Sequence, residues 1–368
     1  MKLHRVELLR LRMPLVAPFR TAYGIETERD VLLIRANLDD TVGWAECTAP
    51  ERPAFSAEYQ QGAYEVIVRH LLPRLFAAHD LTAARVHPAL ATVSGHPMAK
   101  AALESAVLDA QLRRSGMRMA DYLGGIRERV PAGVSIGIPE SLGALLESVA
   151  GYLDAGYRRV KLKIEPGWDL VPVRAVRERY PDLSLQVDAN TSYAQSDVRR
   201  LVELDQFDLQ LLEQPLAADD LPGHARLARR LRTPVCLDES IASARMAAAA
   251  IDLGACSVVN IKAARVGGYL EARRVHDVCS ASGIPVWCGG MLETGVGRAA
   301  NVALASLPGF VLPGDISASD RYWVTDLTEP FVLDNEAHLP VPVAPGIGVE
   351  PDPAILADLT VHRETFTP

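Results

Sequence analysis

Five short apolar segments recur along the middle of the chain, and each ends in a charged residue. The charged residues are Lys163, Asp188, Glu213, Asp238 and Lys262, spaced 25, 25, 25 and 24 residues apart. A repeat of this length holds one apolar segment and one helical segment, which is a βα unit with a buried parallel strand. Because crossover connections are right-handed, successive units place their strands side by side. The charged residues then lie at the carboxyl ends of the strands, where a (β/α)₈ barrel carries its active site.

Further segments extend this repeat on both sides. A strand is predicted within 131–138, before the repeat, and two more at 284–290 and 310–315, after it. The last of these eight strands is not followed by a clear helix. The sequence therefore predicts an α/β fold with a (β/α)₇β variant of the TIM barrel, which we place at residues 126–321.

The first 125 residues differ in kind and predict an α+β capping domain, residues 1–125. Alternating apolar residues indicate an antiparallel meander and helical periodicity follows it. The predicted strands are 2–12, 31–38 and 41–46, and the predicted helices are about 57–72, 80–92 and 97–115.

Two long loops interrupt this capping domain, at 14–29 and 48–59. Loops of this length in a compact domain usually have a function. From residue 322 the sequence becomes Pro-rich, and we expect the segment 322–368 to pack back on the capping domain and complete it.

Composition and charge argue against several classes of protein. The formal net charge is −8 with no basic run, which argues against binding to nucleic acid or an anionic membrane. No uncharged segment reaches the ~18 residues of a membrane span, and residues 1–19 lack the apolar core of a signal peptide. The five cysteines form no Cys-x-x-Cys pair, which favours free thiols and a cytoplasmic location. They are Cys47, Cys236, Cys256, Cys279 and Cys288.

Three carboxylates at one barrel mouth would repel one another unless a cation lay among them. Asp188, Glu213 and Asp238 end three successive predicted strands. A single strand-end carboxylate is often a salt-bridge partner or a helix N-cap, but three in phase favour a metal site. Oxygen ligands favour a hard cation, and Mg²⁺ leaves coordination positions for water and substrate.

Two lysines flank the three acids. Lys163 lies one strand before the first acid and Lys262 one strand after the last, so they should approach the site from opposite sides. A lysine near a divalent cation and a second lysine is expected to have a lowered pKa and to act as a base. Lys161 points to the same strand face as Lys163, and is expected to hold a substrate carboxylate or to lower the pKa of Lys163. A snorkelling surface role fits poorly, because both faces of these strands are buried.

This arrangement indicates removal of a proton next to a carboxylate. The enediolate intermediate needs stabilisation, which Mg²⁺ on the carboxylate oxygens can provide. If the second lysine returns a proton to the opposite face, the product is the other enantiomer. If a β-leaving group departs instead, the reaction is a dehydration.

The segments VKLKIEPGWD, QVDAN, LLEQP, CLDES and NIKAARVGG resemble the enolase superfamily in its muconate-lactonizing subgroup. Enolase-superfamily sites combine a lysine or histidine base with Mg²⁺. Within the subgroup the chain resembles the o-succinylbenzoate synthase / N-succinylamino acid racemase family, also called N-acylamino acid racemases. The resemblance extends over nearly the full length and includes MPLVAPFRTAYG, IPVWCGGMLETGVGRAANVALASLP and LPGDISASDRYW.

The resemblance implies a role for each matching residue. Asp188, Glu213 and Asp238 would bind Mg²⁺, which Mn²⁺ or Co²⁺ can replace, and Lys163 and Lys262 would be the acid/base pair. Glu239 and Asn190 would lie beside the metal ligands. The implied substrate-binding residues are Lys161, Ser135, Asn190, Arg265, Gly290, Met291, Phe19 and Tyr23.

The resemblance leaves the physiological reaction open. The substrate would be an N-acylamino acid or a cyclohexadiene carboxylate, the latter dehydrated in menaquinone biosynthesis, and the enzyme would be a homo-oligomer. Arg265 matches an arginine typical of members that also racemise. Pro50 stands where a larger apolar residue is expected, which leaves the preferred acyl group and side chain open.

Two other readings compete. A dipeptide epimerase or a muconate-type cycloisomerase would keep the fold, but GGMLETG lacks the Asp-x-Asp motif of the epimerases. A non-catalytic structural protein on the same fold would have lost a lysine or a metal ligand, and none is lost.

Overall fold

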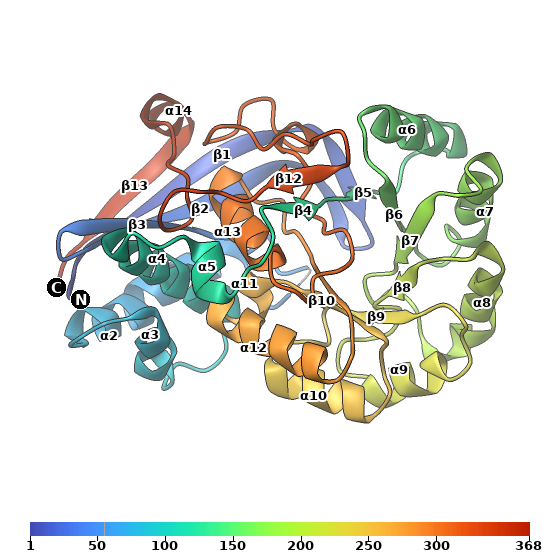
Figure 1. Cartoon of the computed structure of the whole chain (residues 1–368), viewed down its shortest axis with the longest axis horizontal. Helices are drawn as coiled ribbons and strands as arrows, with labels where there is room; N and C mark the ends of the chain where they lie inside the picture. The colour runs from blue at the N-terminus through green and yellow to red at the C-terminus, as the bar shows by residue number, and fades with distance from the viewer. Residues whose placement is uncertain (55) are drawn as a thin grey trace.

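A computed structural model of the chain describes residues 1–54 and 56–368. The N-terminal part is an antiparallel sheet in the strand order β13-β1-β2-β3. Its strands are β1 (Leu3–Thr21), β2 (Gly24–Leu38), β3 (Thr41–Cys47) and β13 (Thr360–Phe366). Val6 of β1 pairs with Phe366 of β13, so the last strand completes the sheet that the first begins (Figure 1). The expected return of the C-terminal segment to the N-terminal sheet is confirmed.

The predicted loop at 14–29 is wrong, because most of this segment continues β1 and β2 as a paired ribbon. Pro14 is opposite Glu28, and after a shift in register Thr21 is opposite Gly24 at the turn. The prolines that suggest a loop lie at the edges of an unpaired stretch, residues 15–18, where no ladder donor is needed. The ribbon reaches from the sheet to the barrel (Figure 1). The second predicted loop, 48–59, has no regular element in its described part; residue 55 lies outside the described residues.

The helices of the N-terminal part lie close to their predicted positions. They are α1 (Gln60–Val66), the π-helical turn η1 (Ile67–Leu71), α2 (Leu72–Ala77), α3 (Ala83–Leu90), α4 (Pro97–Ser115) and α5 (Met119–Leu123). The buried alanine face of α4 packs on the sheet, and Asp109 accepts a hydrogen bond from the Trp44 backbone N–H at 2.8 Å. A Cβ on Gly43 would lie 2.0 Å from the Ala106 carbonyl oxygen, so this glycine sets the distance between strand and helix.

The second part is a curled parallel sheet in which each strand lies next to its neighbour in the sequence. In the described residues its strands are β5 (Val134–Ile136), β6 (Arg159–Lys163), β7 (Ser184–Asp188), β8 (Leu211–Glu213), β9 (Val235–Leu237), β10 (Val258–Ile261) and β11 (Val286–Cys288). The short apolar runs are fully buried, as parallel strands covered on both faces require.

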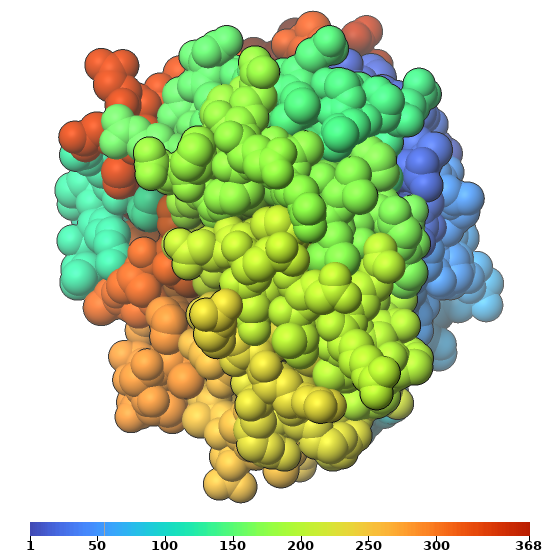
Figure 2. Space-filling view, turned by 90° about the vertical axis from the view of Figure 1, so that its right-hand side faces the viewer, coloured from blue at the N-terminus to red at the C-terminus, as the bar shows by residue number. Residues whose placement is uncertain are grey.

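Helices cover the outside of this sheet, and barrel residues, coloured green to yellow, make up the centre of the face shown in Figure 2, with N-terminal residues, coloured blue, at its right edge. The helices are α6 (Leu142–Asp154), α7 (Leu170–Arg179), α8 (Val198–Val202), α9 (Leu221–Ala228), α10 (Ala244–Asp252), α11 (Ala263–Val266), α12 (Tyr269–Ala281) and α13 (Gly295–Ala305). The 3₁₀ turns η2 (Gln195–Asp197), η3 (Glu203–Phe207) and η4 (Ser319–Arg321), and the tail helix α14 (Pro353–Leu359), complete the element list.

The predicted eighth strand, 310–315, is not formed as a strand. Isolated bridges join Phe310 to Val286 of β11 and Gly314 to Ala132, just before β5. The segment therefore spans the gap between the two edge strands and closes the barrel irregularly. Pro313 has no N–H to donate, which prevents a regular ladder here.

The first barrel strand, β5, is shorter than the predicted segment 131–138. Just before it, β4 (Arg129–Pro131) pairs with β12 (His338–Pro340) in a separate two-stranded sheet. The domain boundaries at 125/126 and 321/322 stay predictions. Along residues 1–54 and 56–368, none of the helices combines the length and the apolar character that crossing a membrane requires.

The close approach of β3 and α4 leads to a stability prediction. Gly43→Ala should lower the free energy of unfolding by about 1–3 kcal/mol, because its methyl group would meet helix backbone that cannot move aside. Gly151→Ala is the matched control: it lies within α6 with no atom within 4 Å of the new Cβ, and should raise stability by about 0.5–1 kcal/mol. Urea unfolding midpoints measure both. Equal midpoints for the two variants would contradict the packing argument.

Candidate active site

The pairing register of β6, β7 and β8 brings the predicted charges together. Lys163 is opposite Asp188, and Asp188 is opposite Glu213. Glu213 is in turn opposite Cys236, two residues before Asp238. The 25-residue spacing thus makes Lys163, Asp188 and Glu213 direct lateral neighbours at the carboxyl end of one sheet, whereas Asp238 lies two residues beyond the partner of Glu213.

Each of the three lysines contacts one or more of the acids. Lys163 Nζ donates to Asp188 Oδ2 at 2.6 Å, and Lys161 Nζ donates to Glu213 Oε2 at 2.6 Å. Lys161 Nζ is also 3.3 Å from Asp188 Oδ2. On the far side of the site, Lys262 Nζ lies 2.8 Å from Asp238 Oδ2. Acids and lysines therefore form one buried group with alternating charge.

These contacts shift the pKa values of the group in both directions. Burial by itself would raise the pKa of Asp188, but Lys163 and Lys161 hold it below its usual value. Burial, reinforced by the charge of Asp188, raises the pKa of Glu213. Burial also opposes the charge of Lys161 and Lys262, yet the adjacent carboxylates raise the pKa of both. The lowered pKa predicted for a lysine beside a divalent cation stays a prediction.

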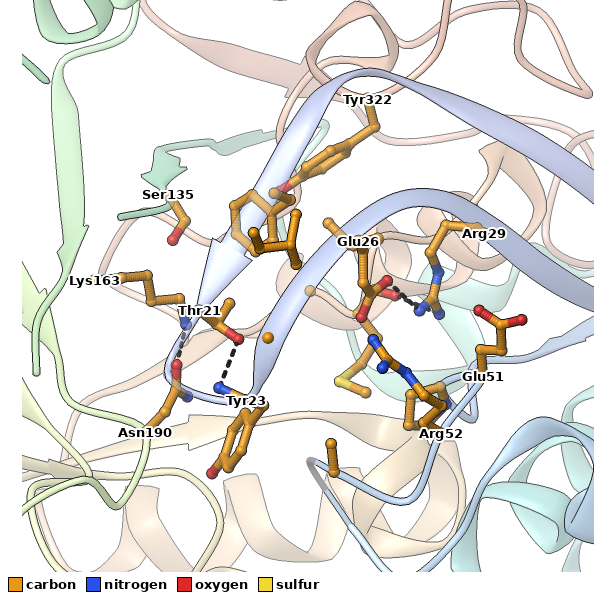
Figure 3. Close-up of a pocket in the computed structure, with 18 of the residues that line it drawn as sticks. Thr21, Tyr23, Glu26, Arg29, Glu51, Arg52, Ser135, Lys163, Asn190 and Tyr322 are labelled. Atoms are coloured by element: carbon orange, nitrogen blue, oxygen red, sulfur yellow. Dashed lines mark hydrogen bonds and ion pairs between the residues drawn. The ribbon is translucent and has the colours of Figure 1, made fainter. Parts of the chain in front are cut away.

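A cavity of about 330 Å³ opens above this group. Its wall includes all three lysines and the cap residues predicted from the N-terminal loop. The predicted substrate-binding residues that line it are Lys161, Ser135, Asn190, Gly290, Met291, Phe19 and Tyr23. Among the described residues, the buried Ser135 hydroxyl has no hydrogen-bond partner, and Figure 3 shows it pointing into the cavity from β5.

The turn of the β1–β2 ribbon is fastened to the barrel beside Lys163. Tyr23, at the turn, donates from its hydroxyl to Glu239 Oε1 at 3.0 Å. Asn190 Nδ2 donates to the same oxygen at 3.1 Å, and Asn190 Oδ1 accepts from Lys163 Nζ at 2.7 Å (Figure 3). Burial and the Glu239 charge raise the pKa of the Tyr23 phenol. The cap and the predicted acid/base residue thus share one hydrogen-bond chain.

Arg265 does not line the cavity, although substrate binding was predicted for it. It is buried beneath the acids, where Nη2 lies 2.8 Å from Asp238 Oδ1 and donates to the Asn260 carbonyl oxygen at 3.1 Å. Lys262 lies on the other oxygen of the same carboxylate. Arg265 therefore contacts the site through Asp238. It lies on the short helix α11, which begins directly after Lys262.

Asp315 is a residue of the site that the repeat did not include. It lines the cavity, and its two oxygens lie 2.6 Å from Lys161 Nζ and 2.6 Å from Arg159 Nη1. Both cations also lie over the indole of Trp287, at 4.6 Å and 5.6 Å from the ring centroid. The sequence does contain a signal for Asp315, because it ends the eighth predicted strand, in LPGD. Asp188, Glu213 and Asp238 have the same position in their own units.

The chemistry of the three acids fits a hard cation. Asp188, Glu213 and Asp238 are at most 1% exposed, and each oxygen of Asp238 faces a cation, Arg265 or Lys262. The ammonium group of Lys161 contacts both Asp188 and Glu213, and that of Lys262 contacts Asp238. In the part of the chain that the structure describes, no three His, Cys, Asp or Glu side chains are placed to hold a metal together.

Comparisons with known proteins agree with this fold and site. Residues 5–124 match the mandelate racemase / muconate lactonizing enzyme N-terminal domain, and residues 144–355 match the enolase C-terminal domain-like family. An N-succinylamino acid racemase of Amycolatopsis sp is 61% identical over 99% of both chains. An o-succinylbenzoate synthase of Geobacillus kaustophilus is 45% identical over 94% of this chain and 93% of its own.

A solved structure of an enolase-superfamily member from Listeria innocua superposes with a TM-score of 0.95 at 40% identity, covering 100% of this chain and 99% of the other. The chain is an enzyme of the enolase superfamily and belongs to the family of N-succinylamino acid racemases and o-succinylbenzoate synthases. The predicted resemblance is confirmed.

A carboxylate from the N-terminal sheet supports the loop that carries Gly290 and Met291. Glu46 Oε2 accepts hydrogen bonds from the Thr294 backbone N–H at 3.0 Å and from its hydroxyl at 2.7 Å, at the start of α13. Glu293, next to it, accepts from the Met291 N–H at 2.8 Å. Burial, and then the charge of Glu293, raise the pKa of Glu46 to about 7. This contact joins the two parts of the molecule next to the cavity.

The raised pKa of Glu46 predicts a pH dependence of stability. Because the folded protein favours the protonated carboxyl, the contribution is complete below the ordinary value of 4.5 and is lost as pH rises through about 7. The loss is on the order of 3 kcal/mol. Glu46→Gln should flatten the stability profile between pH 5 and about 8, measured by urea unfolding, whereas the exposed Glu147→Gln on α6 should keep the wild-type profile. If the stability of Glu46→Gln fell with pH as steeply as that of the wild type, the Glu46 carboxyl would not be a source of the pH dependence.

Proposed function

We propose that this enzyme racemises N-succinylamino acids by moving the proton next to the substrate carboxylate, and that it also dehydrates a cyclohexadiene carboxylate to o-succinylbenzoate. One observation carries the proposal: Lys163 and Lys262 both line the cavity, from β6 and from the end of β10, on opposite sides of the acids. Two ammonium groups in this relation can reach the two faces of one carbon atom. The identity of 61% to a racemase puts racemisation first.

The remaining site residues have consistent roles in this proposal. One lysine removes the proton while the other donates to the opposite face, so each acts as base for one enantiomer. Lys161, held by Asp315 and Glu213, is placed to neutralise a substrate carboxylate. The unpaired Ser135 hydroxyl offers a hydrogen bond to the acyl part of the substrate.

Asp188, Glu213 and Asp238 would hold Mg²⁺, or Mn²⁺ or Co²⁺ in its place. When bound, the cation would neutralise the negative charge that develops on the substrate carboxylate. Arg265 and Asn190 would keep Asp238 and Lys163 in position, and Glu239 would anchor Asn190 and Tyr23.

Dehydration would use the same residues with a different division of work. Lys163 would remove the proton and Lys262 would remain a cation while the hydroxyl leaves from the same face. A dipeptide epimerase reaction is less well supported, because an L-Ala-D/L-Glu epimerase of Bacillus subtilis is only 26% identical to this chain. Five free cysteines fit a cytoplasmic enzyme, and we retain a homo-oligomer as part of the proposal.

The test of the proposal follows proton exchange at the α-carbon. With N-succinyl-L-phenylalanine, Mg²⁺ and D₂O, the wild type should lose the α-proton NMR signal and the optical rotation together. Lys163→Ala and Lys262→Ala should each abolish racemisation, and each should retain α-proton exchange with at most one enantiomer, opposite for the two variants. The exposed Lys2→Ala should behave as wild type.

The outcomes separate the two activities. Exchange without loss of rotation would mean that only one lysine transfers protons, which would overturn racemisation. Dehydration without any exchange would leave a dedicated synthase. Racemisation that survives in either lysine variant would exclude the two-base assignment.

The metal assignment predicts a loss of Mg²⁺ affinity. Asp238→Asn removes one of three negative charges and should weaken Mg²⁺ binding by about tenfold or more, because affinity follows the charge of the ligands. Isothermal titration measures the affinity and circular dichroism checks the fold. Asp252→Asn, an exposed acid at the end of α10, is the matched control. Unchanged affinity in Asp238→Asn would remove this residue from the ligand set.

A further inference from the structure

Arg321 is a buried cation outside the cavity that touches several of the residues forming its wall. It ends the turn η4 and is 8% exposed. Its guanidinium carbon lies 4.7 Å from the ring centroid of Tyr322, 5.0 Å from that of Tyr152 and 5.6 Å from that of Phe19. Among the described residues it forms no ion pair with a carboxylate. Three aromatic rings therefore provide its electrostatic environment.

The contacts of Arg321 join three separate parts of the chain. Phe19 belongs to the ribbon of β1 and β2, Tyr152 lies on α6, and Tyr322 follows η4. Nη2 donates to the carbonyl oxygen of Ser135, on β5, at 2.9 Å. Phe19, Tyr322 and Ser135 line the cavity and Arg321 does not. Figure 3 shows Ser135 on the side of the ribbon where Lys163 lies, and Tyr322 near the top of the ribbon.

The ribbon needs an external support at this point. Residues 15–18 have no partner on β2, and Phe19, opposite Glu26, is the first paired residue after this gap. Two backbone hydrogen bonds dock this stretch: Val16 N–H to the Tyr322 carbonyl and Ile138 N–H to the Arg20 carbonyl, at 3.0 and 2.9 Å. Neither bond involves the side chain of Phe19. Stacking on Arg321 and edge contact with Tyr322, with centroids 6.3 Å apart, are what orient its ring.

An arginine suits this position better than a lysine. The guanidinium is planar and weakly hydrated, so it can stack on aromatic faces and still donate in its plane. A buried stacked cation of this kind contributes more than an exposed one. A lysine would keep the charge but would lose the stacking plane and the fixed direction toward Ser135.

Resting on the proposed function, we propose that Arg321 is a positioning residue for substrate binding. It fixes the bulged part of the ribbon over the barrel mouth by stacking on Phe19 and holding Ser135. The two acid/base lysines come from β6 and from the residue after β10, whereas the hydrogen bond of Arg321 goes to β5. Loss of Arg321 should therefore weaken substrate binding far more than it slows proton transfer.

The kinetic test compares three variants with wild type. Arg321→Met, of similar length but uncharged, should raise KM for the N-succinylamino acid by about tenfold and change kcat by less than about threefold. Phe19→Leu should have a similar effect, because it removes the ring from the same stack. Arg321→Lys should recover part of the affinity, since it retains the charge. A fall in kcat with unchanged KM would overturn the proposal.

A second measurement needs no substrate. Hydrogen–deuterium exchange of residues 14–29 should be faster in Arg321→Met and in Phe19→Leu than in wild type, while the barrel strands exchange as before. Arg20→Gln is the matched control: it breaks only the exposed ion pair with Glu165 on the same ribbon, and should exchange as wild type. Unchanged exchange in Arg321→Met would refute the positioning role.

The two measurements distinguish the possible failures. If the wild type turns over neither substrate, the proposed function fails, and ribbon exchange still decides the role of Arg321. If Arg321→Met does not fold, Arg321→Lys and Phe19→Leu carry the same comparison. Global acceleration of exchange in these two variants would mark Arg321 as a general stability residue and overturn the proposal.

Discussion

The structure depends on the burial of several carboxylates at one end of a parallel sheet. Removing a carboxylate from water is costly unless a cation compensates it closely. Here every acid of the ladder has an ammonium or guanidinium group within 3 Å: Asp188 has Lys163, Glu213 has Lys161 and Asp238 has Lys262 and Arg265. The functional side chains are thus also the counter-charges that permit the barrel to close over them. The same lysines therefore stabilise the fold and line the site.

The N-terminal part contributes to the site through a few specific contacts. The ribbon of β1 and β2 covers the cavity and is fastened at its turn by Tyr23 and Glu239. Glu46 supports the far side of the cavity from the sheet itself. Arg29, also buried, donates to the Met291 carbonyl oxygen at 3.2 Å. These contacts lie around the rim of the cavity, whereas the charged residues of its floor come from the barrel strands.

The barrel and its charged floor could be predicted from the sequence because the charged residues recur once in every βα unit. Successive βα units place their strands side by side in one sheet. Lys163, Asp188 and Glu213 are in register since each occupies the last place of its strand. Where position within a unit did not carry the information, prediction failed. Prolines concealed the ribbon at 14–29, because a bulge tolerates them as well as a loop does. Asp315 was not recognised, although it ends the predicted strand 310–315, because it lies beyond the regular spacing that runs from Lys163 to Lys262.

Arg321 and Arg265 show a further limit, since a buried arginine acts through partners that are distant in the sequence. Arg321 meets Phe19 and Ser135 only after the chain has closed the barrel, and no local pattern encodes that meeting. The same holds for Arg265 and Asp238, which lie on successive units. Site residues at strand ends are accessible to sequence reasoning, whereas residues that orient them require the folded structure.

The pairing of β13 with β1 has a consequence for folding kinetics. Val6 meets Phe366 across nearly the whole chain, so this strand pair closes the longest loop in the molecule. Contacts of such separation form late. Until residues 360–366 are in place, the outer edge of β1 offers unpaired backbone groups to any other strand. The late arrival of this short segment therefore leaves the edge open to association between copies that are still folding, and the pairing of β13 then closes it.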